Sequence, residues 1–206
     1  LPPIYFFDIK FSKFRSSTLY NRDRIRELID AAGKWSGRSI TQESLQQAIS
    51  LCGRNRELLS EMNRYRISDP VRISGTQAIK MIGASLFMPK EEHCRLMEVF
   101  LSGADNLPEI SKKRIFLSGS MHDNTQFYEL VESCGAVIVG EDHDMGNRIF
   151  MGPEMDASEP VASITDFYHL RFPASKKSLV SERVSLLVDQ VKKTKAQAVI
   201  FYINKF

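Results

Sequence analysis

Cysteine, tryptophan and long apolar runs are scarce in this sequence. Its 206 residues include three cysteines and one tryptophan. The cysteines are widely spaced and none belongs to a Cys-x-x-Cys pair, which excludes the zinc-ribbon and dithiol redox classes. No apolar run approaches the length of about 18 residues that a membrane-spanning helix needs, and the first residues lack the pattern of a secretion signal. We therefore expect a cytoplasmic protein without a membrane partner.

A strong excess of one charge is also missing. Lys and Arg number 28 against 25 Asp and Glu, which gives a formal net charge of +3. The basic residues are scattered and form no stripe, so we expect no nucleic-acid partner. Hydrophobic residues make up 43% of the chain and charged residues 26%, an ordinary globular composition that can supply a core.

Three segments of different character follow one another along the chain. Residues 1–18 combine prolines with several aromatic residues and predict an extended aromatic arm. Residues 19–108 predict a helical domain, with helices that begin near Asn21 and Thr41. Residues 109–206 alternate between strand and helix patterns and predict a Rossmann-like α/β domain. Because the sequence lacks an initial methionine and stops within an apolar strand, we expect an excised part of a larger subunit.

We expect the tryptophan and the three cysteines to lie in the hydrophobic core. Trp35 is expected to anchor the helical part. The three cysteines, Cys52, Cys94 and Cys134, fall within predicted helices or at helix ends, where buried free thiols are expected.

A strand, helix and strand pattern near the middle of the chain is the most informative feature. Apolar runs predict parallel strands at 114–118, 136–140 and 197–203, with a helix over 124–134 and another over 179–194. Right-handed crossovers place the carboxyl ends of such strands at one edge of the sheet. Ligands bind in the crevice at this edge in open α/β folds, so we expect function there.

Polar residues follow the first two of these strands. The first strand ends in a Ser-Gly-Ser turn, whose backbone amides could hold an anion. The second ends in Glu141, Asp142, His143 and Asp144, with Arg148 nearby. Four successive ionisable side chains could ligate a metal, perform acid–base chemistry or hold a substrate. The alternative is a solvated acidic turn in which Arg148 forms a salt bridge with one of the carboxylates.

Five motifs in a fixed order resemble a known family. They are WSGRSITQESLQQAI, PVRISGTQA, RIFLSGS, VESCGAVIVGEDHDMGNR and AQAVIFYINKF. The sequence is similar to the D-component subunits of 2-hydroxyacyl-CoA dehydratases and benzoyl-CoA reductases. The resemblance implies an oxygen-sensitive anaerobic enzyme of two related subunits, each able to carry a 4Fe-4S cluster between Rossmann-like lobes. It also implies an ATP-hydrolysing iron–sulfur activator protein that injects one electron, so that the acyl-CoA thioester is reduced to a ketyl-type radical.

One departure from the family pattern concerns the cluster. Dehydratase members place a cysteine in the loop after the second strand, and that position falls on Asp144 here. Thiolates are the usual ligands of such clusters. Either His143 or Asp144 replaces the thiolate, or the subunit is a cluster-free scaffold or acyl-CoA-binding subunit, or the isolated piece is inactive. For the isolated piece we expect the third, inactivity. For the full-length protein the first two interpretations stay open.

The expected site combines both loops. A radical on the thioester needs hydrogen bonds where charge develops, and the Ser-Gly-Ser turn is placed to supply them. Arg148 could pair with a CoA phosphate or with the loop carboxylates. An unrelated α/β domain that binds a small phosphorylated ligand at the same turn is a further alternative. The predicted residues are Ser118, Ser120 and Glu141 for catalysis, Gly119, Gly146 and Arg148 for binding, and His143 and Asp144 for the metal.

Overall fold

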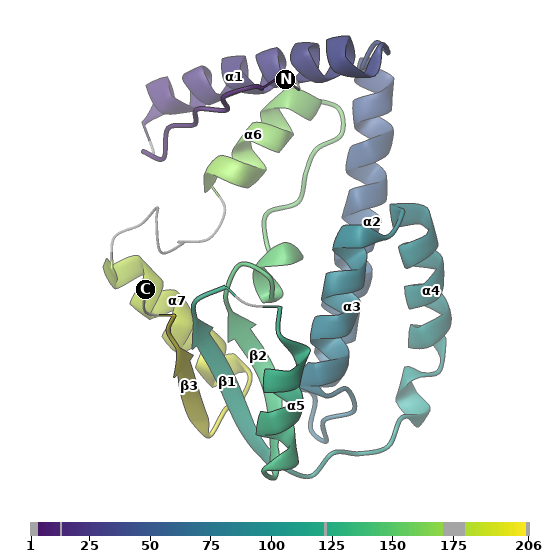
Figure 1. The fold of residues 1–206 in the computed structure, drawn as a ribbon, viewed down its shortest axis with the longest axis vertical. Coiled ribbons are helices and arrows are strands. Elements are labelled where there is room, and N and C mark those ends of the chain that lie inside the picture. Colours follow the sequence, from purple (N-terminus) through teal and green to yellow (C-terminus); the bar gives the residue numbers. More distant parts are fainter. Residues whose placement is uncertain (1–3, 13, 122, 171–179, 205–206) are drawn as a thin grey trace. The chain divides into compact units, whose positions relative to one another are not determined.

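The chain has a mixed α/β fold, seen in a computed structural model that describes residues 4–12, 14–121, 123–170 and 180–204 (Figure 1). Within these ranges, every helix is too short or too polar to cross a membrane. The helices and strands, in chain order, are α1 (Arg15–Ser36), α2 (Gln42–Ile67), α3 (Gly75–Phe87), α4 (Lys90–Ser102), the short 3-10 helix η1 (Ala104–Asn106), β1 (Lys113–Gly119), α5 (Thr125–Ser133), β2 (Ala136–Asp142), the 3-10 helix η2 (Asn147–Ile149), α6 (Pro160–Leu170), α7 (Val180–Lys193) and β3 (Ala198–Tyr202).

The described chain divides into two compact units. The first contains residues 1–53 and 152–178, and the second contains residues 54–151 and 179–206. The boundary expected at residue 108 does not coincide with this division. The reason is that α3 and the second half of α2 belong with the sheet in the second unit, whereas α6 packs with α1 in the first.

In the first unit, the amino-terminal arm lies along α1. Asn21, expected to cap this helix, is instead buried within it and fixes the arm: its side chain accepts a hydrogen bond from the Lys10 amide (2.8 Å) and donates one to the Lys10 carbonyl (2.9 Å). The helix therefore begins at Arg15, earlier than predicted. His169 of α6 contacts the same region through the Ser12 carbonyl, at 2.6 Å from its Nε2.

The expected burial of Trp35 is wrong. This residue lies in the last turn of α1 and is 50% exposed. Its ring packs edge-on against Tyr5 of the arm, with ring centroids 6.3 Å apart. Trp35 therefore covers the arm at the surface and does not anchor the helical core.

In the second unit, side-chain hydrogen bonds define the start of α3. Ser74 and Gln77 form a reciprocal capping box at the start of α3. The carboxylate of Glu132, from α5, accepts hydrogen bonds from the Gly75 amide (2.8 Å) and the Ile138 amide (3.1 Å). One side chain thus ties α3 to β2, and its negative charge lies at the positive end of the α3 dipole.

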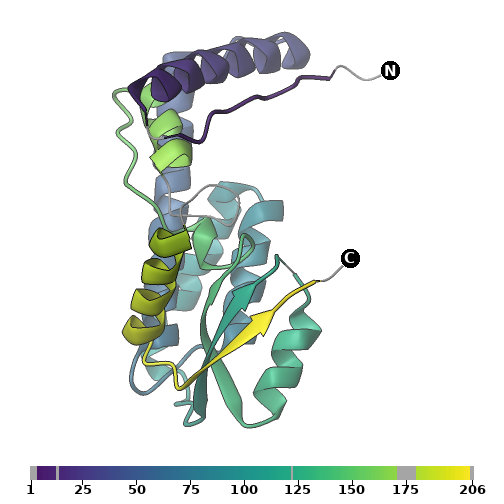
Figure 2. The same ribbon diagram turned by 90° about the vertical axis from the view of Figure 1, so that its left-hand side faces the viewer.

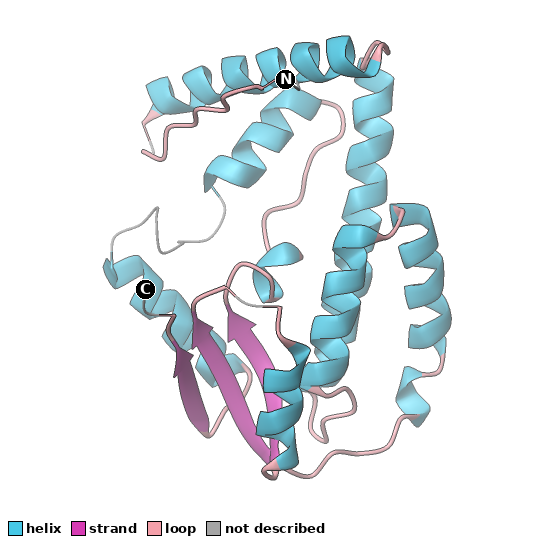
Figure 3. Cartoon of the chain, in the orientation of Figure 1, coloured by secondary structure: helices cyan, strands magenta, loops and turns pink. Residues whose placement is uncertain are grey.

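The three strands form one parallel sheet in the order β2-β1-β3, which confirms the predicted strands (Figure 3). The helices α5 and α7 lie on opposite faces of this sheet (Figure 2). On the α5 face, Leu117 and Ile138 pack with Ile79 of α3 and Tyr128 of α5. Val137 and Val139 point to the other face, because successive residues of a strand alternate.

The cysteines only partly match expectation. Cys94 is buried, and its sulfur lies 3.5 Å from the Asn55 amide nitrogen. Cys52 is half-buried, and the burial expected for Cys134 is wrong because this residue is exposed. Cys134 follows the last turn of α5, where the chain turns at Gly135 into β2, so its side chain faces solvent instead of the sheet.

Candidate functional site

The two polar loops leave the same edge of the sheet, as the sequence predicts. In the parallel register, Leu117 lies opposite Glu141 and Ser118 lies opposite Asp142. The third strand ends beside them, because Gly119 lies opposite Tyr202. Figure 1 shows the carboxyl ends of the three strands at one end of the sheet. The candidate site is therefore built from the turn after β1 and the loop after β2.

The Ser-Gly-Ser turn is fastened to the end of β3. The Ser120 amide donates to the Tyr202 carbonyl (2.7 Å), and its hydroxyl accepts from the Asn204 amide (3.0 Å). Gly119 has a φ of +136°, and a Cβ here would lie 1.9 Å from the Tyr202 carbonyl oxygen. Glycine is therefore required for this close approach. Because the Ser120 amide already donates to Tyr202, it is not available to bind an anion at this turn.

Glu141 lies beneath the second loop in a buried ion pair. Its carboxylate pairs with both terminal nitrogens of Arg66, at the end of α2, and both side chains are fully buried. The Arg66 Nε donates to the Ile138 carbonyl (3.0 Å), and Nη1 also donates to the Asn147 Oδ1 (3.3 Å). One guanidinium thus joins β2 to the far end of the loop. The catalytic role predicted for Glu141 stays a prediction, since its carboxylate faces Arg66 here.

The electrostatics keep this pair ionised. Burial raises the pKa of Glu141, but the positive charge and hydrogen bonds of Arg66 outweigh it, and the net pKa lies below the ordinary value. Burial also opposes the charge of Arg66, while Glu141 raises its pKa above the usual value. The pair is therefore a fixed salt bridge within the fold.

His143 is held from inside the unit. Its Nε2 lies 2.9 Å from the hydroxyl oxygen of Tyr128, and both residues are buried. The pKa of Tyr128 is raised, mainly by burial and secondly by the negative charge of Glu141. The phenol therefore stays protonated and can donate a hydrogen bond to the imidazole of His143. Of the two predicted metal ligands, His143 thus faces the core.

Asp144 lies at the surface of the loop, whereas the side chain of Arg148 is largely covered. Arg148 donates to Asp142 at 2.5 Å and lies 4.0 Å from Asp144, whose side chain is 66% exposed. Arg148 therefore pairs with the loop carboxylates, the second of its two expected partners. Gly146 has a packing role, because a Cβ there would lie 2.2 Å from the Cγ of Glu141. The loop can close over the buried carboxylate only if this residue is glycine.

The described residues do not fit a 4Fe-4S cluster. Such a cluster needs several thiolates converging on one point. The loop offers His143, turned toward Tyr128, and Asp144, turned outward beside Arg148. In the described part of the chain, no group of three or more His, Cys, Asp or Glu side chains is arranged to hold a metal ion. His143 and Asp144 therefore do not form a ligand set for a cluster.

Arg66 and Tyr128 are the two site residues that sequence reasoning missed. Arg66 lies in a polar stretch of α2, 75 positions before its partner, and resembles any solvated basic residue of a helix. The sole signal was the Glu141 carboxylate at the end of an otherwise apolar strand, since a buried charge requires an opposite charge.

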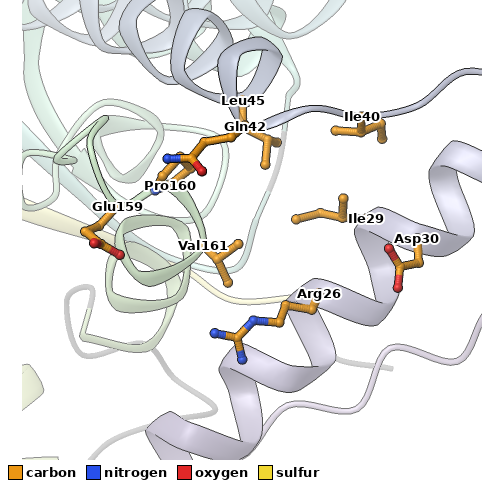
Figure 4. Close-up of a pocket in the computed structure, with 9 residues that line it drawn as sticks. All are labelled: Arg26, Ile29, Asp30, Ile40, Gln42, Leu45, Glu159, Pro160 and Val161. Carbon is orange, nitrogen blue, oxygen red and sulfur yellow. The ribbon is translucent and has the colours of Figure 1, made fainter.

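A cleft of about 480 Å³ lies in the first unit, and its lining includes none of the predicted site residues. It is formed by α1, the start of α2 and the start of α6, and Figure 4 shows Ile29 of α1 and Val161 of α6 on opposite sides of the opening. Arg26, Asp30 and Glu159 add charges of both signs at its walls. This mixed lining selects no single ligand class.

Comparison with known proteins gives consistent matches. The model of the family described as "2-hydroxyglutaryl-CoA dehydratase, D-component" matches residues 1–206. The chain is 24% identical over 195 residues to one of the subunits of benzoyl-CoA reductase from Thauera aromatica, covering 91% of this chain and 50% of that protein. It is 22% identical over 199 residues to the "(R)-phenyllactyl-CoA dehydratase beta subunit" of Clostridium sporogenes, covering 94% and 52% respectively. The chain thus spans about half the length of these curated relatives.

Proposed function

Because this chain belongs to the 2-hydroxyglutaryl-CoA dehydratase D-component family, we propose that it forms part of a subunit of an enzyme complex that acts on an acyl-CoA thioester. The family match over residues 1–206 is the observation that carries this proposal. The names of both relatives describe subunits whose complexes act on acyl-CoA compounds, which supports it. The proposed partners are a related second subunit and an acyl-CoA substrate.

We place the acyl-CoA contact at the carboxyl edge of the sheet. The turn at Ser118, Gly119 and Ser120 and the loop at 142–148 leave adjacent strands there. In this proposal, the hydroxyl groups of the two serines donate hydrogen bonds to the thioester oxygen, where negative charge develops. Arg148 binds a CoA phosphate, exchanging one of its loop carboxylates for the ligand.

The one-electron, iron–sulfur chemistry that the resemblance implies is proposed for the assembled complex, with an ATP-dependent activator protein as electron donor. A cluster, when bound, would supply electrons at low potential. Its ligands must then come from outside the described residues of this chain, since His143 and Asp144 point in different directions.

A cluster-free subunit that only helps to bind acyl-CoA is the second candidate function. The observation that favours it is the ion pair of Asp144 with Arg148 at the position where the family pattern has a cysteine. In this case, the loop would contact substrate but bind no iron.

Two measurements on the protein, purified without oxygen together with its partner subunit, test the proposal. Calorimetric titration should show tighter binding of benzoyl-CoA or (R)-phenyllactyl-CoA than of inorganic phosphate, and Arg148→Gln should weaken it. Arg95→Gln, which changes an exposed arginine of α4, serves as the matched control. Iron analysis separates the candidates: about four irons per subunit favour the redox role, and iron confined to the partner favours the cluster-free role. Absence of any thioester binding would refute both.

A further inference from the structure

The loop after β2 is anchored by a residue from a distant part of the sequence. Arg66 makes hydrogen bonds to three separate points: the Ile138 carbonyl within β2, the Glu141 carboxylate near its end, and the Asn147 side chain beyond the loop. These points lie before, at the start of and after the segment 142–146. A single planar guanidinium therefore fixes the distance between the two ends of the loop.

Stability alone does not explain this arrangement. A buried ion pair contributes little net stability compared with apolar side chains of similar volume, because both charges lose their hydration. Arg66 and Glu141 are nevertheless completely buried. The neighbouring Gly146 packs on the Glu141 side chain, so the ion pair also forms the floor of the loop. The pair is thus suited to hold a geometry.

We propose that Arg66 is a positioning residue, which acts through Glu141 and Asn147 to fix the loop 142–148 and, with it, the positions of Asp144 and Arg148 at the substrate-facing edge. The proposal rests on the proposed function of this edge. The contact between Tyr128 and His143 supports the same loop at its middle, so that the loop has buried attachments at both ends and at the centre. The side chains of the loop that face the substrate are then already oriented when the substrate binds.

The test separates positioning from stability by replacing both charges at once. The double variant Arg66→Met, Glu141→Met leaves no unpaired buried charge. Its midpoint of unfolding should therefore equal or exceed that of the wild-type protein. The loop, however, loses its attachment to Asn147. Arg64→Met, which removes an exposed arginine from the same helix, is the matched control. All variants are prepared in the complex with the partner subunit.

Two readouts are compared in this complex. Backbone amides of residues 142–148 should exchange about tenfold faster or more in the double variant, the effect of losing hydrogen bonds to a charged group. The kcat/KM for (R)-phenyllactyl-CoA or benzoyl-CoA should fall about 100-fold, as expected when reacting groups are misplaced. A double variant with restored stability, wild-type exchange and wild-type kcat/KM would overturn the proposal. If the wild-type complex acts on neither thioester, the proposed function fails, and the exchange comparison still decides the role of Arg66.

Discussion

The turn after β1 and the loop after β2 leave the same edge of the sheet, yet they are held by different kinds of contact. Main-chain hydrogen bonds to β3 hold the first, through the Ser120 amide and the Tyr202 carbonyl. Buried charged side chains hold the second, through Arg66 and Glu141. Main-chain pairing needs only that no Cβ intervenes, whereas a buried ion pair needs both of its members. The two halves of the site should therefore fail in response to different substitutions.

The largest effect is expected from breaking the ion pair on one side. Glu141→Leu leaves the Arg66 charge buried without its partner, and should lower the free energy of unfolding by about 3–5 kcal/mol. Denaturant titration measures this change. Asp144→Asn, on the exposed part of the same loop, should change it by less than about 1 kcal/mol. Equal effects of the two substitutions would mean that the buried pair does not hold the loop.

A smaller effect is expected from crowding the main-chain contact. Gly119→Ala and Gly135→Ala both place a Cβ at positive φ, but only the first meets an obstacle, the Tyr202 carbonyl oxygen at 1.9 Å. We expect a loss of about 1 kcal/mol for Gly135→Ala and about 3 kcal/mol for Gly119→Ala. Hydrogen exchange of β3 should rise in the Gly119 variant alone. An equal cost at both positions would contradict the close approach of β3.

Acidification should weaken the loop after β2 and spare the turn after β1. The pKa of Glu141 is lowered in the folded protein. The ionised carboxylate therefore makes its full contribution to stability above the pKa of the unfolded state, and this contribution is lost as the pH falls through the pKa of the folded state. Amide exchange of residues 142–148, corrected for intrinsic rates, should therefore increase below about pH 4. The Arg66→Met, Glu141→Met variant should lack this dependence. The same dependence in both proteins would assign it to other carboxylates.

The smallest effect is expected at the rim of the loop. Asp142→Asn removes the charge that pairs with Arg148, a pair with 11% and 14% of its side chains exposed. The loss of stability should be about 1–2 kcal/mol, because this largely covered pair loses a hydrogen bond between charged groups but keeps some contact with solvent. Thioester binding should instead improve or stay constant, because Arg148 is released for the CoA phosphate. Weaker binding, measured by calorimetry, would argue against this role of Arg148.

Much of the second unit could be predicted from the sequence, because local patterns determine it. The runs at 115–117 and 136–139 are apolar on both faces, as buried parallel strands require. The parallel order then brings Ser118 beside Asp142. These relations need only periodicity and the rules for parallel connections.

The contacts that shape the site were harder to predict, because they join distant residues. Nothing near Arg66 in the sequence distinguishes it from the exposed Arg64 two positions earlier. Likewise, the sequence predicts Asn21 as a helix cap, but its side chain binds the main chain of the arm. Trp35 is predicted as a core residue, but it packs on the arm at the surface. In each case, the partner lies elsewhere in the chain, and tertiary packing overrides the local signal.

The most direct test of this account is hydrogen exchange of the assembled complex with and without benzoyl-CoA and (R)-phenyllactyl-CoA. We predict slower exchange both in residues 118–121 and in residues 142–148 when a thioester binds, with no change in the peptides that line the cleft in the first unit, which include Ile29 and Val161. Protection confined to that cleft, or binding without protection of either loop, would contradict the placement of the acyl-CoA site at the carboxyl edge of the sheet.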